Sequence, residues 1–459
     1  MTSAKQKEFW KYFFDTFKSG KYLLAKFILT SVLCIVISVI SNLLGVKELT
    51  YLNAFLSLSY FASMISFGIS SGVLVFVNQN IDSKENVSKY VRQGFELNLI
   101  ASLLFTAFLV AAPRFVMEKI TGYLPEDYTF YYIMCGYFFL TCIFGYLSNV
   151  IQNFELFKIT LFVVASPLVL TIISFLILYF AGAFYLVLIA IMYASTQLVG
   201  TVFAIVCLMR NKLFPINALK PAALKFKVSQ WRLLFSVFFS EFVWSVGYYA
   251  TSVALLRVDE GIFNTYSYLE NVLDLLNGFY FTYAIISSIR ITQALGRNNF
   301  DLAYKHATYS IYATLVLWFA YAAISMILIY PIALGVNDAY FNLMFIALPA
   351  YLIINLFRFV GWMFCSYMLK LGGKTTLLLV MEILATLYLI GLCFFIQYLP
   401  QNVFLIYTMV SLGEIVPVPI YFYMYKSKKW MVNINDNSAL AADTKTENLT
   451  TPADNTNKK

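Results

Sequence analysis

Twelve apolar runs, each of about 20 residues or more, determine what this chain of 459 residues can fold into. An α-helix of that length crosses the hydrocarbon core of a bilayer, and without a closed barrel no other element can do so. The runs lie near 22–45, 51–80, 93–112, 128–150, 158–181, 184–209, 231–256, 262–289, 307–330, 341–369, 375–398 and 402–425. The sequence therefore predicts an all-α polytopic membrane protein with twelve transmembrane helices.

The composition agrees with a membrane protein and excludes several other classes. Hydrophobic residues make up 61% of the chain and charged residues only 12%, whereas soluble domains carry about 25% charged residues. The net charge of +9 comes from basic residues that flank the apolar runs, so we expect no nucleic-acid partner. No phosphate-binding loop, GxSxG, HExxH or dinucleotide-binding motif is present in the sequence. We therefore expect neither an enzyme nor a cofactor, and we expect a monomer.

The distribution of lysine and arginine predicts the orientation in the membrane. Most of the 32 basic residues lie in the N-terminal segment, in the loops after the even-numbered helices and just past the last helix. The odd-numbered loops carry only Lys47, Arg114, Lys119 and Arg257. By the positive-inside rule, both termini and the loop at 210–230 are cytoplasmic. We expect a multi-pass protein of the cell membrane, that is, the inner or cytoplasmic membrane.

The loop at 210–230 is the longest connection on the cytoplasmic side and contains two prolines, so it is the predicted boundary between two lobes. Residues 22–209 would form one lobe and residues 231–432 the other. In the segment 1–21, Phe9, Phe13 and Phe17 recur among lysines, which predicts an amphipathic helix on an anionic leaflet. The tail at 433–459 is rich in Asn, Thr, Asp and Ala, and we expect it to be disordered.

A weak internal repeat supports the division into two lobes. An offset of 214 residues places Gln79 on Gln293 and Tyr90 on Tyr304, at the ends of the second and eighth predicted helices. Two six-helix lobes of the same orientation imply a pseudo-two-fold axis along the membrane normal, with a central cavity between the lobes. Transporters use this plan.

Glu241 is the most informative charged residue, because it lies near the middle of the run at 231–256. A charge there is costly unless it is paired, hydrated or protonated. Two interpretations compete. In one, Glu241 binds a proton or Na⁺ and changes its affinity with conformation. In the other, Glu241 and Arg358 form a buried pair that holds two helices together, and Arg358 provides charge compensation.

The other charges inside the predicted membrane also fall mainly in the second half. Glu270 and Asp274 are four residues apart on one helical face, which suits either proton binding or a solvated vestibule. Glu382 and Glu414 are further candidates for ion coupling or for pairing. Trp244 and Tyr248 follow Glu241 at +3 and +7, so we expect them on the same face, as walls of a cavity.

Five stretches together resemble the multidrug and toxic compound extrusion (MATE) transporters. The resemblance covers about residues 20–432. The stretches are Phe67-GISSG-Val73 with Gln79, Glu241-FVWSV-Gly247, Gln293-AL-Gly296 followed by Ala303, Asn355 with Leu369-KLGGK-Thr375, and Ser427-KK-Trp430. The resemblance implies secondary active transport in which a substrate leaves the cell while Na⁺ or H⁺ enters. It also implies that Asn355 belongs to the site.

Several positions depart from the family pattern. An Asp of the first helix corresponds to about Ile37, the Gly of the first Gln-x-x-Gly is Asp82, and the Asp of Gly-Gly-Asp-Thr is Lys374. Coupling through an acid of the first lobe is therefore not expected.

The resulting expectation is a Na⁺- or H⁺-coupled antiporter that exports amphipathic organic cations or drugs by alternating access. Glu241, Glu270, Asp274, Asn355 and Glu414 are the candidate coupling and substrate residues, with Glu241 as a candidate Na⁺ ligand. The alternative is a flippase for lipid-linked oligosaccharides or polysaccharides, which would need a basic cavity.

Overall fold

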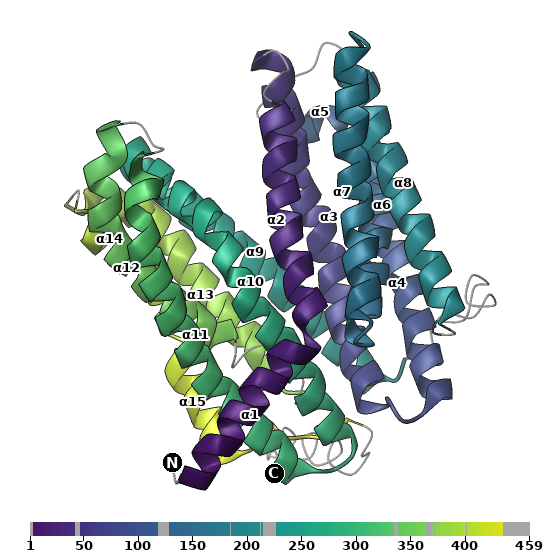
Figure 1. Cartoon of the computed structure of the whole chain (residues 1–459), viewed down its shortest axis with the longest axis vertical. Coiled ribbons are helices and arrows are strands. Elements are labelled where there is room, and N and C mark those ends of the chain that lie inside the picture. Colours follow the sequence, from purple (N-terminus) through teal and green to yellow (C-terminus); the bar gives the residue numbers. More distant parts are fainter. Residues whose placement is uncertain are drawn as a thin grey trace, which may run out of the picture.

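The computed structural model describes residues 3–41, 46–117, 128–183, 185–211, 213, 226–334, 338–362, 369–370, 372–400 and 402–434. Every regular element in these ranges is a helix (Figure 1). The first lobe contains α2 (Lys21–Ser41), α3 (Val46–Gln79), α4 (Lys84–Ala111), α5 (Pro113–Phe115), α6 (Thr129–Asn153), α7 (Phe157–Phe180) and α8 (Leu186–Arg210). The second contains α9 (Val228–Val258), α10 (Glu260–Gly296), α11 (Phe300–Leu334), α12 (Asp338–Trp362), α13 (Thr375–Phe395), η4 (Ile396–Tyr398), α14 (Val403–Ile415) and α15 (Val418–Ser427).

The described helices account for the twelve predicted crossings. Ten candidate spans are long and apolar enough to cross a membrane, and one of them combines α14 and α15 into the span Val403–Ser427. The 21-residue α2 and the 37-residue α10 complete the set within the described chain. The prediction of an all-α fold with twelve transmembrane helices in two lobes is confirmed. Most of the loop at 210–230 and the tail beyond Ile434 lie outside the described residues.

The two lobes repeat the same packing pattern. In the first lobe α2 packs against α7, α3 against α4 and α6, and α6 against α8. In the second lobe α9 packs against α13, α10 against α11 and α12, and α12 against α14, which are the equivalent pairs six helices later. Between the lobes, α3 contacts α9 and α10 contacts α2, again as equivalent pairs. This reciprocity is what a two-fold relation between the lobes requires.

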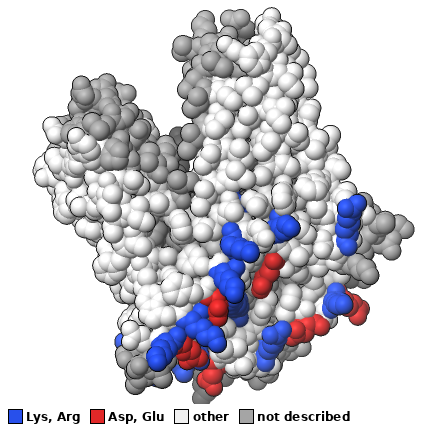
Figure 2. Space-filling view, viewed as in Figure 1, with Lys and Arg blue, Asp and Glu red and all other residues white. Residues whose placement is uncertain are grey.

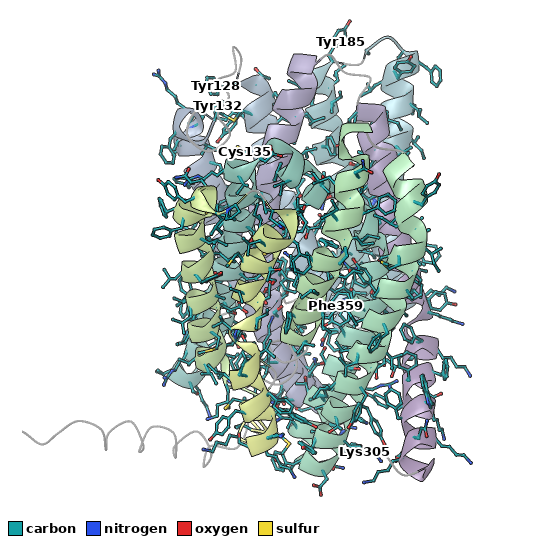
Figure 3. All side chains as sticks on the ribbon, turned by 90° about the vertical axis from the view of Figure 1, so that its left-hand side faces the viewer. Tyr128, Tyr132, Cys135, Tyr185, Lys305 and Phe359 are labelled. Carbon is teal, nitrogen blue, oxygen red and sulfur yellow. The ribbon has the colours of Figure 1, made fainter. Side chains whose placement is uncertain are left out.

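The lobes diverge toward one end of the molecule and converge toward the other, where α1 (Ser3–Ser19) and α15 lie (Figure 1). The space-filling view shows the same notch at the upper end, and Lys and Arg gather at the lower end (Figure 2). Figure 3 shows Tyr128, Tyr132 and Tyr185 at the upper end and Lys305 at the lower end. Tyrosine at one edge and lysine at the other are typical of residues that flank a membrane.

Glycines of the FGISSG stretch make the close contact between the lobes. A Cβ on Gly68 would lie 3.2 Å from Cα of Phe238, and one on Gly72 would lie 2.9 Å from Cδ2 of Leu234. Both glycines belong to α3 and both partners to α9. Small residues let two helix backbones approach within a membrane, where packing rather than the hydrophobic effect drives association.

The converging ends of the lobes meet at the two positions that the internal repeat relates. A Cβ on Gly296, at the end of α10, would lie 2.3 Å from the carbonyl oxygen of Gln79, at the end of α3. Next to this contact, Arg297 donates hydrogen bonds of 2.9 Å from Nε and Nη2 to the two carboxylate oxygens of Asp82. Asp82, which stands where the family pattern has Gly, therefore forms an ion pair between the lobes.

The segment after α15 joins the same contact. Asn433 donates from Nδ2 to the carbonyl oxygen of Gly296 at 3.2 Å and to Oδ1 of Asn298 at 2.8 Å. The backbone N–H of Ile434 donates to Oε1 of Gln79 at 2.8 Å. The last described residues thus bind to the ends of α3 and α10 and connect the two lobes.

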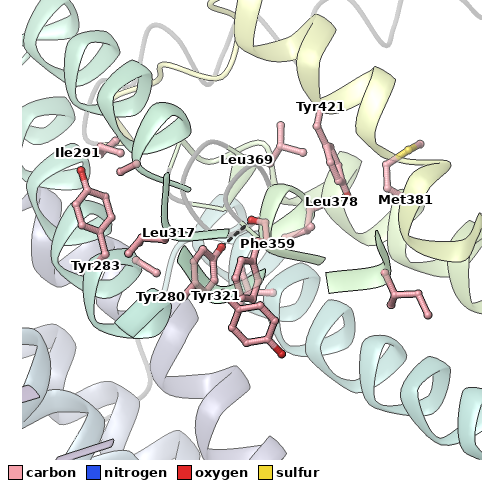
Figure 4. Close-up of a cluster of buried hydrophobic side chains, with 14 of the residues drawn as sticks. Tyr280, Tyr283, Ile291, Leu317, Tyr321, Phe359, Leu369, Leu378, Met381 and Tyr421 are labelled. Atoms are coloured by element: carbon pink, nitrogen blue, oxygen red, sulfur yellow. Dashed lines mark hydrogen bonds between the residues drawn. The ribbon is translucent and has the colours of Figure 1, made fainter. Parts of the chain in front are cut away.

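The interior of the second lobe is rich in aromatic residues, and one stacked pair lies close to the ion cluster described below. The rings of Tyr280 and Phe359 are parallel, with centroids 4.1 Å apart, and the Tyr280 hydroxyl donates to the backbone oxygen of Phe359 at 2.7 Å (Figure 4). Phe359 lies about halfway along the molecule (Figure 3). This contact fixes α12 against α10 at the residue that follows Arg358.

Two expectations about local structure are revised or refined. The predicted twelfth helix is broken, because α14 ends at Ile415 and α15 begins at Val418, around Pro417. Proline removes a backbone donor and its ring crowds the preceding turn, which explains the break. The N-terminal helix α1 forms as expected, but Phe9 and Phe13 are buried against α10 and α11 and do not face a leaflet.

Candidate ion and substrate site

Arg358 of α12 is the centre of an ion cluster inside the second lobe. Its Nη1 donates to Oε1 of Glu270 at 2.8 Å, its Nε to Oε1 of Glu414 at 3.4 Å, and its Nη2 to the Tyr266 hydroxyl at 2.6 Å. The partners come from α10 and α14, so one guanidinium connects three helices. The side chains of Arg358 and Glu270 are 18% and 19% exposed, and a pair this shielded interacts more strongly than a surface pair.

Two aromatic residues of α9 extend the cluster. The Tyr248 hydroxyl donates to Oε2 of Glu270 at 2.7 Å, so each oxygen of that carboxylate has a donor. The rings of Trp244 and Tyr248 are stacked with centroids 5.9 Å apart. The guanidinium carbon of Arg358 lies 5.9 Å from the centre of the Tyr248 ring, within the range of a cation–π contact.

A small cavity opens beside this cluster. Its volume is about 30 Å³, and its wall includes Trp244, Tyr248, Arg358, Glu382 and Glu414. A space of that size holds roughly one water molecule or a small ion. The structure thus places the two predicted wall residues at a cavity that is too small for an organic substrate but large enough for a coupling ion.

The cluster has more acid than base. Glu270 and Glu414 both contact Arg358, so two carboxylates share one guanidinium. A net negative charge between apolar helices is costly unless it is paired or hydrated. The 3.4 Å bond to Glu414 is the longer of the two, and of these two carboxylates only Glu414 lines the cavity, together with Glu382.

Glu241 forms a separate ion pair with Lys370 of the second lobe. The side chain of Lys370 is only 7% exposed and that of Glu241 is 15% exposed. The Lys370 ammonium also lies 5.3 Å from the centre of the Phe67 ring, and Phe67 belongs to α3 of the first lobe. The pair is therefore covered by the opposite lobe at the contact between α3 and α9.

The predicted pair of Glu241 with Arg358 is not formed. Arg358 lies at the level of Tyr248, and this residue is seven positions beyond Glu241 on α9, about 10 Å along the helix. Arg358 contacts two other acids instead, Glu270 and Glu414, and its role in charge compensation stays a prediction. In this structure the Glu241 carboxylate pairs with the ammonium of Lys370. Binding of a proton or Na⁺ at Glu241 stays a prediction.

The remaining predicted residues are only partly connected to this cluster. Asn355 is buried one turn before Arg358, and its Nδ2 donates to the Tyr321 hydroxyl at 3.3 Å. Glu382 lies on the cavity wall. The side chain of Asp274 lies outside the described residues. Within the described chain, no group of three or more His, Cys, Asp or Glu residues is arranged to hold a metal ion.

Sequence reasoning missed Lys370 and Tyr266. Lys370 lies beyond the described end of α12, inside the stretch Leu369-KLGGK-Thr375, but only the structure shows that it is buried and pairs with Glu241. Tyr266 is one of 34 tyrosines, and nothing in the spacing of the chain marks it. Its position four residues before Glu270 is the one available signal, because residues at i and i+4 share a helix face.

Part of the first lobe matches a family model. Residues 23–177 match the MatE model. Comparison with curated proteins gives no significant match.

Solved structures match most of the chain. An outward-facing multidrug resistance MATE family transporter of the MOP superfamily matches with a TM-score of 0.77 at 13% identity, over 90% of this chain and 96% of that one. A MATE crystal structure in the straight conformation gives 0.75 at 13% identity, over 90% and 95%. A MOP superfamily transporter from Pyrococcus furiosus gives 0.74 at 13% identity, over 90% and 96%, and reverse polarity of its binding pocket has suggested a different function. At these identities the likeness establishes the fold.

Proposed function

We propose that the chain is a MATE transporter, because residues 23–177 match the MatE model and the fold is similar to that of MATE crystal structures. We propose further that it exports amphipathic organic cations or drugs in exchange for Na⁺ or H⁺. The observation that carries the proposal is the sharing of Arg358 between Glu270 and Glu414 beside an ion-sized cavity. A site with one carboxylate in excess can bind a proton or Na⁺ and release it again.

The converging end of the lobes carries most of the Lys and Arg, so we place it in the cytoplasm, together with both termini. The divergent end then faces outside, and this conformation is the one that accepts ions from the exterior. The contacts of Gly296 with Gln79 and of Asp82 with Arg297 would close the cytoplasmic side in this state.

In the proposed mechanism, an ion from outside enters the cavity and neutralises Glu414. Arg358 then loses one of its two acidic partners, and the connection between α12 and α14 weakens. Because α14 is separated from α15 by the break at Pro417, α14 can shift without moving the whole span. A ligand changes a conformational equilibrium only through different affinities for the two states, and the change in the Arg358 contacts would supply that difference.

The contact between the lobes near Glu241 would change in the same transition. When the lobes separate on the cytoplasmic side, Phe67 moves away from Lys370, and the pair of Glu241 with Lys370 becomes open to water. Trp244 and Tyr248 would offer aromatic faces to flat lipophilic cations only in a state where the cavity beside them is wider than in this conformation. A flippase for a pyrophosphate-linked lipid needs free basic groups, whereas Arg358 and Lys370 both contact acids, so the geometry favours the efflux function.

Transport measurements on the purified protein in proteoliposomes test this proposal. Ethidium, a flat organic cation, is the substrate, and an inward gradient of either Na⁺ or H⁺ is imposed separately. We expect one of the two gradients to drive ethidium transport against its concentration gradient. Transport that responds to neither ion would contradict coupled export.

A further inference from the structure

The N-terminal helix α1 has two different faces, and the second lobe covers only one of them. Phe9 and Phe13 pack against the rings of Tyr309 and Tyr283, with centroids 5.8 and 5.5 Å apart. Glu8 also forms an ion pair with Lys305. These contacts fix the rotation of α1 about its own axis.

The opposite face of α1 is exposed and carries a regular set of residues. Lys7, Trp10, Lys11, Phe14 and Lys18 follow one another at spacings of three, one, three and four residues, which places them on one side of a helix. All five are exposed, with Trp10 at 37% and Phe14 at 63%, and the two aromatic rings are stacked. Two acids adjoin this set along the chain: Asp15 at its edge, and Glu8, which pairs with Lys305.

The height of α1 in the molecule places this face beside a bilayer surface. The helix lies against the first turns of α11, near Lys305 and Tyr309. The candidate span of α11 has 31 residues, or about 46 Å, which exceeds a hydrocarbon core of about 30 Å. The first turns of α11, and α1 with them, therefore lie at the level of the lipid headgroups. Figure 2 shows Lys and Arg in a band over α1, with some Asp and Glu among them.

We propose that the exposed face of α1, formed by Lys7, Trp10, Lys11, Phe14 and Lys18, is a binding surface for anionic phospholipids of the adjacent leaflet. Lysine ammonium groups contact the phosphates, while Trp10 and Phe14 enter the boundary between headgroups and acyl chains. Each lysine near an anionic surface favours the bound state about fivefold. This inference holds whatever the protein transports.

The consequence for the transporter follows from the connections of α1. The helix continues through Gly20 into α2 of the first lobe but docks on α10 and α11 of the second. Arg290 of α10 donates to Oγ1 of Thr16 at 2.8 Å and to Oγ of Ser19 at 3.2 Å. Lipid bound to the outer face would hold α1 in its docked position, where it connects the two lobes.

Fluorescence quenching tests the surface on the full chain in nanodiscs. The nanodiscs contain either brominated phosphatidylglycerol or the same fraction of brominated phosphatidylcholine. The fluorescence of Trp10 is obtained by subtracting the tryptophan fluorescence of the Trp10→Phe variant from that of the parent protein. We expect stronger quenching by the anionic lipid. The triple variant Lys7→Gln, Lys11→Gln, Lys18→Gln should lose this preference. The melting temperature of the triple variant shows whether it is folded.

A matched control removes three exposed lysines elsewhere at the same end of the molecule: Lys84→Gln, Lys89→Gln and Lys429→Gln. This variant should keep the lipid preference. Equal quenching by both lipids would show that Trp10 enters the bilayer without recognition of the headgroup. Absence of quenching would show that this face of α1 contacts water or a protein partner and not lipid. Either result, or an equal loss in the control variant, would overturn the proposal.

Discussion

Arg358 and Glu270 are joined by a 2.8 Å hydrogen bond between Nη1 and Oε1, and this bond ties α12 to α10 inside the second lobe. Because Glu414 shares the same guanidinium, the three side chains act as a unit whose net charge is negative. The contacts that hold these three helices together are therefore also the contacts that the proposed coupling ion would change.

Removing Arg358 should destabilise the protein. Arg358→Ala leaves Glu270 and Glu414 without their shared cation, and loss of one partner from a buried pair costs about 3–5 kcal/mol. We expect a lower melting temperature in detergent and a lower folded yield. Adding Glu270→Gln and Glu414→Gln should restore part of both, because the unpaired charges are then gone. An unchanged melting temperature for Arg358→Ala would show that the guanidinium is solvated.

Gly296 should be required for closure of the converging ends. A Cβ there would lie 2.3 Å from the Gln79 carbonyl oxygen and 2.6 Å from its Cα, and backbone atoms cannot rotate away as a side chain can. Gly296→Ala should push the ends of α3 and α10 apart, at a cost of about 1–3 kcal/mol. Spin labels at Lys89→Cys and Asp301→Cys, in a background without native cysteines, would report a longer distance.

The control for this prediction is Gly391→Ala in α13, where an added Cβ meets no atom within 4 Å. It should leave the distance between the labels unchanged. A Gly296→Ala variant with the same distance distribution as the parent would show that the contact is not a closure point.

The pair of Asp82 with Arg297 should stabilise the closed arrangement of the converging ends, and near neutral pH this contribution should not depend on pH. The hydrogen bonds from Arg297 lower the pKa of the Asp82 carboxyl below its ordinary value. A group whose pKa is lowered on folding contributes stability above its unfolded pKa and loses it as the pH falls through the folded pKa. The contribution is therefore constant between about pH 5 and pH 8.

Charge reversal tests the same pair. Asp82→Arg should repel Arg297 and lengthen the distance between the spin labels, and adding Arg297→Asp should shorten it again. A change in label distance between pH 5 and pH 8 that persists in Asp82→Asn would have to come from other groups, such as the carboxylates near Arg358. Loss of that change in Asp82→Asn would contradict the assignment of a lowered pKa.

The pair of Glu241 with Lys370 should matter more for transport than for stability. Removing both charges together should therefore slow transport but leave the protein folded. Glu241→Gln alone leaves a nearly buried ammonium, so we expect a loss of stability. Glu241→Gln with Lys370→Gln should recover most of the stability, yet ethidium transport in proteoliposomes should remain slow. Wild-type transport by the double variant would show that the pair is only structural.

The sequence predicted the helices well because each crossing is a long apolar run. The number of spans, the two lobes and the equivalence of Gln79 with the end of α10 all follow from length, hydropathy and the offset of 214 residues. The glycines of the FGISSG stretch lie where α3 meets α9, although their contact partners could not be named.

The partners of the intramembrane charges could not be predicted in the same way. A single carboxylate in an apolar run has no periodic signal that shows which neighbouring helix it faces. The sequence allows Arg358 as a partner of Glu241, but in the structure Arg358 contacts Glu270 and Glu414. Phe9 and Phe13 matched a membrane-facing pattern, and only the docking of α1 shows that protein covers them.

Ion movement driven by the substrate tests the central claim most directly. An outward ethidium gradient is imposed across proteoliposomes without any ion gradient, and proton or Na⁺ flux is recorded with an internal fluorescent indicator. The parent protein should move one of these ions in the opposite direction, and Glu414→Gln should abolish that flux while Glu85→Gln, at the exposed start of α4, keeps it. Ion flux in Glu414→Gln equal to that of the parent would contradict the assignment of the Arg358 cluster as the coupling site.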